Sequence, residues 1–140
     1  ARFEIDLVEK VEPGIATRDR PVILIDYPAP QAALARCRDE NPPVAERWEL
    51  YIGGLELANA YSELTDAQEQ RRRFQDWAGK RRDNNRAIYS IDENFMQAIE
   101  DDMPPAGGIA FGIDRLLMLI TDNTDISAVS AFPENYSAGE

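Results

Sequence analysis

The chain has 140 residues, 26 of them acidic and 15 basic, which gives a formal net charge of −11. It has no histidine and one cysteine, Cys37, so imidazole-based catalysis, an internal disulfide and a cysteine-built zinc site are excluded. Its chemistry must rest on carboxylates, arginine, amides, hydroxyls or hard cations such as Mg²⁺. The length suits one domain, and the lack of disulfides or a signal-peptide pattern favours the cytoplasm. The chain begins without methionine, which suggests a piece of a longer protein.

The first apolar run predicts a buried strand. Residues 22–25 are four consecutive aliphatic side chains, and such a run is typical of a strand that is buried on both faces. Pro28 and Pro30 end it. Residues 31–36 predict a short helical turn or loop, and the Asn-Pro-Pro at residues 41–43 predicts a loop.

A hairpin is predicted around Gly53 and Gly54, because a Gly-Gly pair between alternating segments can supply both positive φ angles of a tight turn. The alternation extends from Arg47 to Tyr61. One predicted face carries Trp48, Leu50, Ile52, Leu55 and Leu57. The other carries Arg47, Glu49, Tyr51, Glu56 and Ala58.

Helices and one further strand follow. Thr65-Asp66-Ala67-Gln68 fits a capping box, and it begins a predicted helix that ends at residues 83–85. A second helix is expected from about Asp92 to residues 104–105, and a glycine-rich strand at residues 107–112 leads into a helix at 113–120. The apolar stripe of the first helix consists of Ala67, Phe74, Trp77 and Ala78. That of the second helix consists of Phe95, Ile99 and Met103. This order predicts an α+β fold with a mostly antiparallel sheet backed by helices.

Positive charge is concentrated between Arg71 and Arg86, here called the basic segment. This segment has a net charge of +5, whereas the rest of the chain totals −16. Such a run is typical of a solvated helix face, and it also suits docking of an acidic partner.

Two carboxylates point to a cation. Across a two-residue turn, Glu49 and Glu56 are diagonal neighbours on one face, where like charges need relief by a cation, a proton or solvent. Mg²⁺ held by one or two carboxylates and by substrate phosphates would supply it. The alternative is a pair of glutamates on a wet face.

Two further groups are candidate binding elements. Glu63 and the neighbouring Tyr61 could together bind an ammonium group. The alternative is that Glu63 is a surface carboxylate. Glycines in the strand at 107–112 leave room for a flat ring, and Arg115 in the following helix could bind a phosphate. Tight packing is the alternative explanation of these glycines.

Three ordered blocks resemble the C-terminal half of a class II lysyl-tRNA synthetase catalytic domain. They are Glu46-Arg47-Trp48-Glu49-Leu50-Tyr51, Gly54 to Asp66, and Gly108-Ile109-Ala110-Phe111-Gly112-Ile113-Asp114-Arg115, the last of which looks like motif 3. The resemblance extends from about Pro21 to Phe132. It implies the C-terminal portion of a class II synthetase-like domain over residues 1–140, without motifs 1 and 2.

Two details resemble a paralogous family, the elongation factor P–(R)-β-lysine ligases. Lysyl-tRNA synthetases tend to have Glu-Val-Ser-Pro-Leu-Ala where this chain has Pro-Gln-Ala-Ala-Leu-Ala at residues 30–35, and glycine where it has Ala110. This resemblance implies formation of a β-lysyl adenylate from ATP and transfer to a lysine of elongation factor P. The negative charge fits such a protein substrate better than tRNA.

The resemblance also implies roles for individual residues. Glu49 and Glu56 would hold Mg²⁺ against ATP, Gly112 would line the adenine site, and Arg115 would be the catalytic residue that binds the phosphates. The amino-acid site would consist of Asn59, Tyr61, Glu63 and Ala110. Strict alternation places Asn59 opposite Glu56, so a bulge near Ala58 is expected if both line one site.

The departures from the family leave alternatives open. Motif 1, which builds the family's homodimer interface, and motif 2, whose arginine grips the α-phosphate, would lie upstream, so we expect this chain alone to make no detectable adenylate. The family usually has Gly-Phe at residues 60–61, where this chain has Ala-Tyr. Half of a true lysyl-tRNA synthetase and a non-catalytic binding or regulatory paralogue are the other hypotheses.

Overall fold

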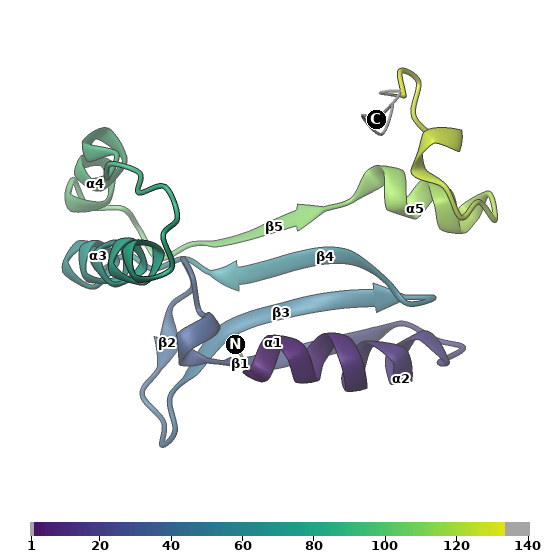
Figure 1. Cartoon of the computed structure of the whole chain (residues 1–140), viewed down its shortest axis with the longest axis horizontal. Coiled ribbons are helices and arrows are strands. Elements are labelled where there is room, and N and C mark those ends of the chain that lie inside the picture. Colours follow the sequence, from purple (N-terminus) through teal and green to yellow (C-terminus); the bar gives the residue numbers. More distant parts are fainter. Residues whose placement is uncertain (1, 134–140) are drawn as a thin grey trace. The chain divides into compact units, whose positions relative to one another are not determined.

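The computed structural model describes residues 2–133 and contains one five-stranded sheet (Figure 1). Its strands are β1 (Val22–Pro28), β2 (Cys37–Arg38), β3 (Val44–Ile52), β4 (Leu55–Ser62) and β5 (Gly107–Phe111). Their order is β1-β3-β4-β5, and β2 pairs antiparallel with β3. The main helices are α1 (Arg2–Asp6), α2 (Glu12–Ala16), α3 (Ala67–Asp83), α4 (Glu93–Glu100) and α5 (Ile113–Ile120). The predicted α+β class with a mostly antiparallel sheet is confirmed.

The described chain divides into two compact units. The first unit contains residues 2–24, 48–59 and 109–133, and the second contains residues 25–47 and 60–108. Strands β1, β3, β4 and β5 each have residues in both units, and the second unit also contains β2.

A helical stretch that the sequence analysis missed opens the first unit. A π-helical turn at Leu7–Val11 joins α1 to α2, which makes residues 2–16 helical throughout. Apolar side chains recur every four residues at positions 3, 7, 11 and 15, and this spacing is the signal that could have predicted the helix. Ile15 is the buried residue of the stretch.

The hairpin between β3 and β4 is confirmed. Gly53 and Gly54 have φ angles of +58° and +81°, as a tight turn with two left-handed residues requires. A Cβ on Gly54 would lie 2.9 Å from the Cβ of Ala16, so the end of α2 lies directly against this turn. Glycine at position 54 therefore serves both the turn and its packing.

The prediction that β1 is buried on both faces is wrong. Ile23 and Ile25 are 58% and 60% exposed, and β1 is the terminal strand in the order of the sheet. An aliphatic run fixes the strand conformation, but it does not determine whether both faces are covered.

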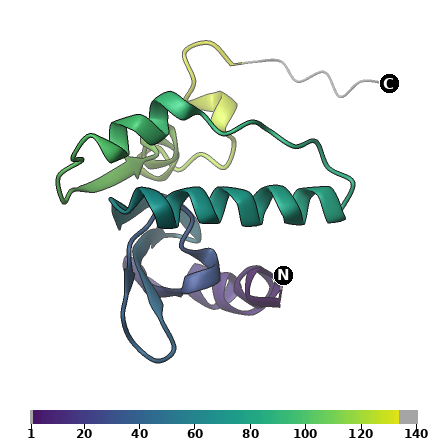
Figure 2. The ribbon, with the colours of Figure 1, turned by 90° about the vertical axis from the view of Figure 1, so that its left-hand side faces the viewer.

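Two aspartates cap the long helices of the second unit, in which α3 is one uninterrupted helix (Figure 2). Asp66 accepts hydrogen bonds from the backbone N–H groups of Gln68 and Glu69, and Asp92 caps α4 in the same way. The N-cap is therefore Asp66 and not Thr65, the residue that the expected capping box would place there. Aspartate is among the preferred N-cap residues. The predicted helix end at residues 83–85 is confirmed.

The apolar stripe predicted for α3 is only partly buried. The rings of Phe74 and Phe95 pack with their centroids 6.0 Å apart, while Trp77 is 48% exposed. Helix α4 ends at Glu100, before the predicted proline stop, and it buries Met96 and Ile99. Within residues 2–133, no helix is both long and apolar enough to cross a membrane.

Candidate functional site

Strand β5 continues directly into α5 (Figure 1), and hydrogen bonds join this junction to β4 in the first unit. Gly112 follows β5 and is the N-cap of α5, and its backbone N–H donates a 2.7 Å hydrogen bond to the carbonyl oxygen of Leu57. Arg115, in the first turn of α5, donates through Nη1 to the carbonyl oxygen of Glu56 at 2.6 Å. Two neighbouring carbonyls of β4 thus hold the start of α5.

Arg115 also lies beside the side chain of Glu56. Its Nη1 is 3.9 Å from Oε2 of the Glu56 carboxylate. The Arg115 side chain is 49% exposed, so the guanidinium is accessible from solvent. A planar, permanently charged group in this position can bind a phosphate through two hydrogen bonds.

A hollow of about 490 Å³, here called the β4–α5 hollow, brings five predicted site residues together. Those residues are Glu56, Asn59, Ala110, Gly112 and Arg115. Glu56 and Asn59 both line this hollow, although strict alternation placed them on opposite faces. The bulge near Ala58 that was expected to permit it remains a prediction.

Glu49 lies outside the lining of the hollow and is buried. It is 5% exposed, and it accepts a 2.8 Å hydrogen bond from the hydroxyl of Tyr51, which is also buried. Burial, this hydrogen bond and the charges of Glu49, Glu12 and Glu56 all raise the pKa of Tyr51. The wet-face explanation is therefore wrong for Glu49, and the Tyr51 hydroxyl is subject to the charges of both predicted metal ligands.

The donor set in this region suits Mg²⁺ only together with a substrate. The described residues include no group of three or more acidic, histidine or cysteine side chains that could hold a metal ion. Glu49 and Glu56 are two hard oxygen donors whose charges both act on the Tyr51 hydroxyl, and Mg²⁺ is commonly held by one or two carboxylates plus substrate phosphates. The residues thus fit a metal that arrives with ATP.

Tyr61 and Glu63 belong to the second unit. The pKa of Tyr61 is raised by burial and then by the charge of Glu63, whereas Arg47 lowers it. The Arg47 guanidinium lies 4.5 Å from the centroid of the Tyr27 ring and donates to the carbonyl oxygen of Gln31. The charge of Glu63 therefore acts on the Tyr61 hydroxyl, as does that of Arg47, a cation that sequence spacing did not indicate.

The arginines that open the basic segment are engaged within the second unit. Arg71 forms a two-pronged hydrogen-bonded pair with Glu93 of α4, and Arg72 pairs with Glu69 and Asp76. These pairs neutralise much of the positive charge that the sequence placed on this helix. The guanidinium groups of Arg71 and Arg72 are thus already bound to carboxylates of the same unit.

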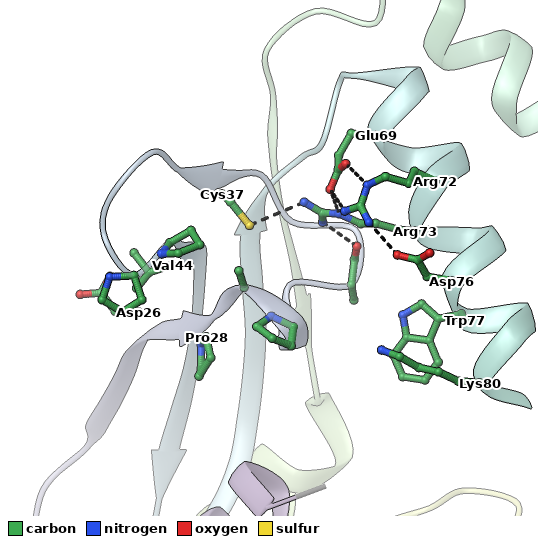
Figure 3. Close-up of a pocket in the computed structure, with 15 residues that line it drawn as sticks. Asp26, Pro28, Cys37, Val44, Glu69, Arg72, Arg73, Asp76, Trp77 and Lys80 are labelled. Atoms are coloured by element: carbon green, nitrogen blue, oxygen red, sulfur yellow. Dashed lines mark hydrogen bonds and ion pairs between the residues drawn. The ribbon is translucent and has the colours of Figure 1, made fainter. Parts of the chain in front are cut away.

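Arg73 is a structural residue of the second unit (Figure 3). Its side chain is 13% exposed, and its guanidinium donates to the carbonyl oxygens of Ala33 and Ala35 at 2.9 and 2.8 Å and to Glu69. The hydrogen bonds from Arg72 and Arg73 lower the pKa of Glu69 to about 2. This arrangement ties α3 to the loop at residues 33–37.

The same arginines line a second, larger hollow of about 780 Å³ (Figure 3). Prolines 28, 30, 42 and 43, Cys37 and Trp77 form much of its wall. None of the predicted site residues lines it. Within the lining, Glu69 pairs with Arg72 and Arg73, and Asp76 pairs with Arg72.

Comparison with known proteins identifies the family. Residues 2–136 match the family model described as tRNA synthetases class II (D, K and N). The lysine–tRNA ligase of Moorella thermoacetica is 45% identical over 123 residues, which cover 88% of this chain and 24% of the relative. The lysine–tRNA ligase of Carboxydothermus hydrogenoformans is 46% identical over 125 residues, or 89% of this chain and 25% of the relative.

A relative of another type is equally similar. The elongation factor P–(R)-beta-lysine ligase of Hamiltonella defensa is 47% identical over 123 residues, which cover 88% of this chain and 38% of the relative. The chain thus spans about a quarter of the length of the lysine–tRNA ligases and rather more of this ligase. Because the family model covers nearly all of it, the chain belongs to the class II tRNA synthetase family of the D, K and N type.

Proposed function

We propose that this chain is the C-terminal part of the catalytic domain of a ligase that activates (R)-β-lysine, or lysine, with ATP in the cytoplasm. The activated group is then transferred to a lysine of elongation factor P. The family match, the similar elongation factor P ligase and Ala110 on the wall of the β4–α5 hollow support this proposal.

The observation that carries the proposal is the meeting of Glu56 and Arg115 at the β4–α5 hollow. A carboxylate and an exposed arginine on one wall, next to the backbone of Gly112, suit a nucleotide phosphate and a flat base. These are the residues that motif matching assigned to ATP.

The proposed reaction needs neither histidine nor a protein nucleophile. The substrate carboxylate attacks the α-phosphorus of ATP, the bond to the β-phosphate oxygen breaks, and pyrophosphate leaves. A lysine amine of elongation factor P then attacks the adenylate carbonyl, AMP leaves, and the amine loses a proton. Alignment and charge stabilisation by groups such as Arg115 supply the catalysis.

Each remaining residue has a proposed binding role. Asn59, Tyr61 and Glu63 bind the amino-acid substrate, with the Glu63 carboxylate receiving an ammonium group. Ala110 narrows the amino-acid pocket. Glu49 and Glu56 hold Mg²⁺, which neutralises phosphate charge when it is bound with ATP.

A true lysyl-tRNA synthetase is the second candidate function, because relatives named lysine–tRNA ligase match at nearly the same identity. Position 110 offers a discriminating change. In the longer protein, Ala110→Gly should shift substrate preference from (R)-β-lysine towards lysine, since it removes a methyl group from the hollow. An unchanged preference would show that Ala110 is not the discriminator.

The decisive experiment uses the full-length protein with ATP, Mg²⁺ and either amino acid. We expect mass spectrometry to show β-lysyl addition to elongation factor P and no charging of lysine tRNA. Charging of tRNA without modification of elongation factor P would overturn the first proposal in favour of the second. The 140-residue chain alone should give no adenylate in ATP–pyrophosphate exchange.

A further inference from the structure

The carboxylate of Glu63 lies against a glycine of the neighbouring strand. A Cβ built on Gly108 of β5 would come within 2.7 Å of the Glu63 Oε1 atom, a distance that real Cβ contacts do not reach. Any side chain at position 108 would therefore occupy the place of this carboxylate. Both residues lie in the second unit.

The backbone of Glu63 is fixed on two sides. Its N–H donates a 2.9 Å hydrogen bond to the carbonyl oxygen of Ala106, and Glu63 forms an isolated antiparallel bridge with Ala35. The next residue, Leu64, donates to the carbonyl oxygen of Leu34 at 2.9 Å. Displacement of the carboxylate must therefore come from rotation of the Glu63 side chain and not from movement of its strand.

Such a rotation costs the fold little. The atom that an added methyl group would meet is the far end of a flexible side chain, and the other nearby atom is the Glu63 carboxyl carbon at 4.0 Å. No backbone atom stands within that range of the added group. A methyl at position 108 should thus leave the protein folded and change where the Glu63 charge lies.

We propose that Gly108 is a positioning residue, whose missing side chain keeps the Glu63 carboxylate over β5 where it receives the substrate ammonium group. This inference rests on the proposed function, because it requires that Glu63 binds the amino acid. Gly108 would thus contribute to amino-acid recognition without touching the substrate, because it acts through the position of the Glu63 carboxylate. Its effect is on amino-acid binding and not on ATP binding.

Gly107 provides a matched control in the same strand. A Cβ on Gly107 would lie 3.5 Å from the carbonyl oxygen of Tyr61, which is ordinary van der Waals contact. Gly107→Ala and Gly108→Ala add the same methyl group to adjacent residues and alter strand propensity alike. A difference between them therefore reports on the contact with Glu63.

The test measures ATP–pyrophosphate exchange by the full-length protein. We expect Gly108→Ala to raise the KM for the amino acid at least about tenfold with the KM for ATP unchanged, the signature of lost substrate binding. Gly107→Ala adds no contact with Glu63 and should therefore not raise the KM for the amino acid. Stabilisation against thermal unfolding by added (R)-β-lysine or lysine should also disappear in Gly108→Ala alone.

A shorter carboxylate should relieve the clash. In the Glu63→Asp background the carboxylate no longer reaches position 108, so adding Gly108→Ala should raise the amino-acid KM no further. If Gly108→Ala leaves that KM unchanged while Glu63→Gln raises it, the inference is overturned and the proposed function stands. If Glu63→Gln has no effect, the proposed role of Glu63 fails and the inference fails with it. A parallel loss of ATP affinity in Gly108→Ala would overturn the inference by showing a general structural defect.

Discussion

The hydroxyl of Tyr51 donates a 2.8 Å hydrogen bond to the carboxylate of Glu49, and both side chains are almost fully buried. A buried carboxylate without such a donor is costly. The hydroxyl also lies 3.4 Å from Oε1 of Glu12 in α2. Tyr51 thus joins the hairpin to the N-terminal helical stretch by polar contacts within the first unit.

Removal of this hydroxyl should destabilise the protein. We expect Tyr51→Phe to lower the free energy of unfolding by about 1–3 kcal/mol, because Glu49 loses a hydrogen-bond donor while it stays buried. Denaturant titration of the two proteins checks this. Tyr89, which is 73% exposed, supplies the control, since Tyr89→Phe should cost less than about 0.5 kcal/mol. Equal effects of the two substitutions would contradict the role of the Tyr51 hydroxyl.

The raised pKa of Tyr51 predicts that the protein loses stability at alkaline pH. Burial and the surrounding carboxylates raise the pKa of Tyr51 in the folded protein above its ordinary value near 10. Above that pH the unfolded chain releases the proton while the folded protein keeps it, so the unfolding free energy falls as the pH rises. Denaturation curves between pH 9 and pH 11 (about one unit to either side of the ordinary value) should show a steeper decline for the native sequence than for Tyr51→Phe.

Arg73 and Arg72 offer a comparison of adjacent arginines. We expect Arg73→Lys to lower the unfolding free energy by about 1–2 kcal/mol, because a lysine cannot reach the carbonyl oxygens of Ala33 and Ala35 in the same fork geometry. Arg72→Lys affects an exposed ion pair and should cost less than about 0.5 kcal/mol. Equilibrium unfolding in urea measures both, and a larger effect at Arg72 would refute the anchoring role of Arg73.

The two turn glycines should respond unequally to alanine. Gly54→Ala places a methyl group 2.9 Å from the Cβ of Ala16 at a φ of +81°, whereas Gly53→Ala meets the flexible end of Leu119 at 3.2 Å. We expect a loss of about 2–3 kcal/mol for Gly54→Ala and about 1 kcal/mol for Gly53→Ala. The difference between their melting temperatures is the measurement, and a reversed order would contradict the packing of α2 on the turn.

Arg115 is the residue on which the ATP assignment depends most. In the full-length protein, Arg115→Lys keeps the charge but loses two-pronged binding, so the KM for ATP should rise about tenfold or more. The KM for the amino acid should stay near its original value. ATP–pyrophosphate exchange measures both constants, and a change confined to the amino acid would remove Arg115 from the nucleotide site.

The sequence predicted turns and helix ends well, because the backbone preferences of one or two residues determine them. Gly53 and Gly54 take the positive φ angles that the sequence indicated, and α3 ends at Asp83, at the start of the range predicted for its end. The predicted burial of Ile25 failed because the exposure of a strand side chain depends on what packs on that face of the sheet, which a local run of residues does not determine. Sequence alternation in β3 also did not reveal that the face bearing Glu49 is a buried one.

The candidate site could be predicted only in part for a similar reason. Motif matching identified Glu56 and Arg115, and the β4–α5 hollow brings them together. The distance from Gly108 to the Glu63 carboxylate depends on side-chain placement across two strands, which no sequence spacing encodes. The pairing of Arg71 with Glu93, 22 positions away in the sequence, could not be predicted for the same reason.

The two bonds from the start of α5 to the carbonyls of Glu56 and Leu57 make the wall of the β4–α5 hollow mechanically stiff. Strand β4 and the start of α5 can separate there only after both hydrogen bonds have broken. Amide hydrogen exchange at Gly112 should therefore report the opening of β4 rather than the fraying of a helix end. The hollow is therefore preorganised for a ligand, and little of the binding free energy is needed to order the protein.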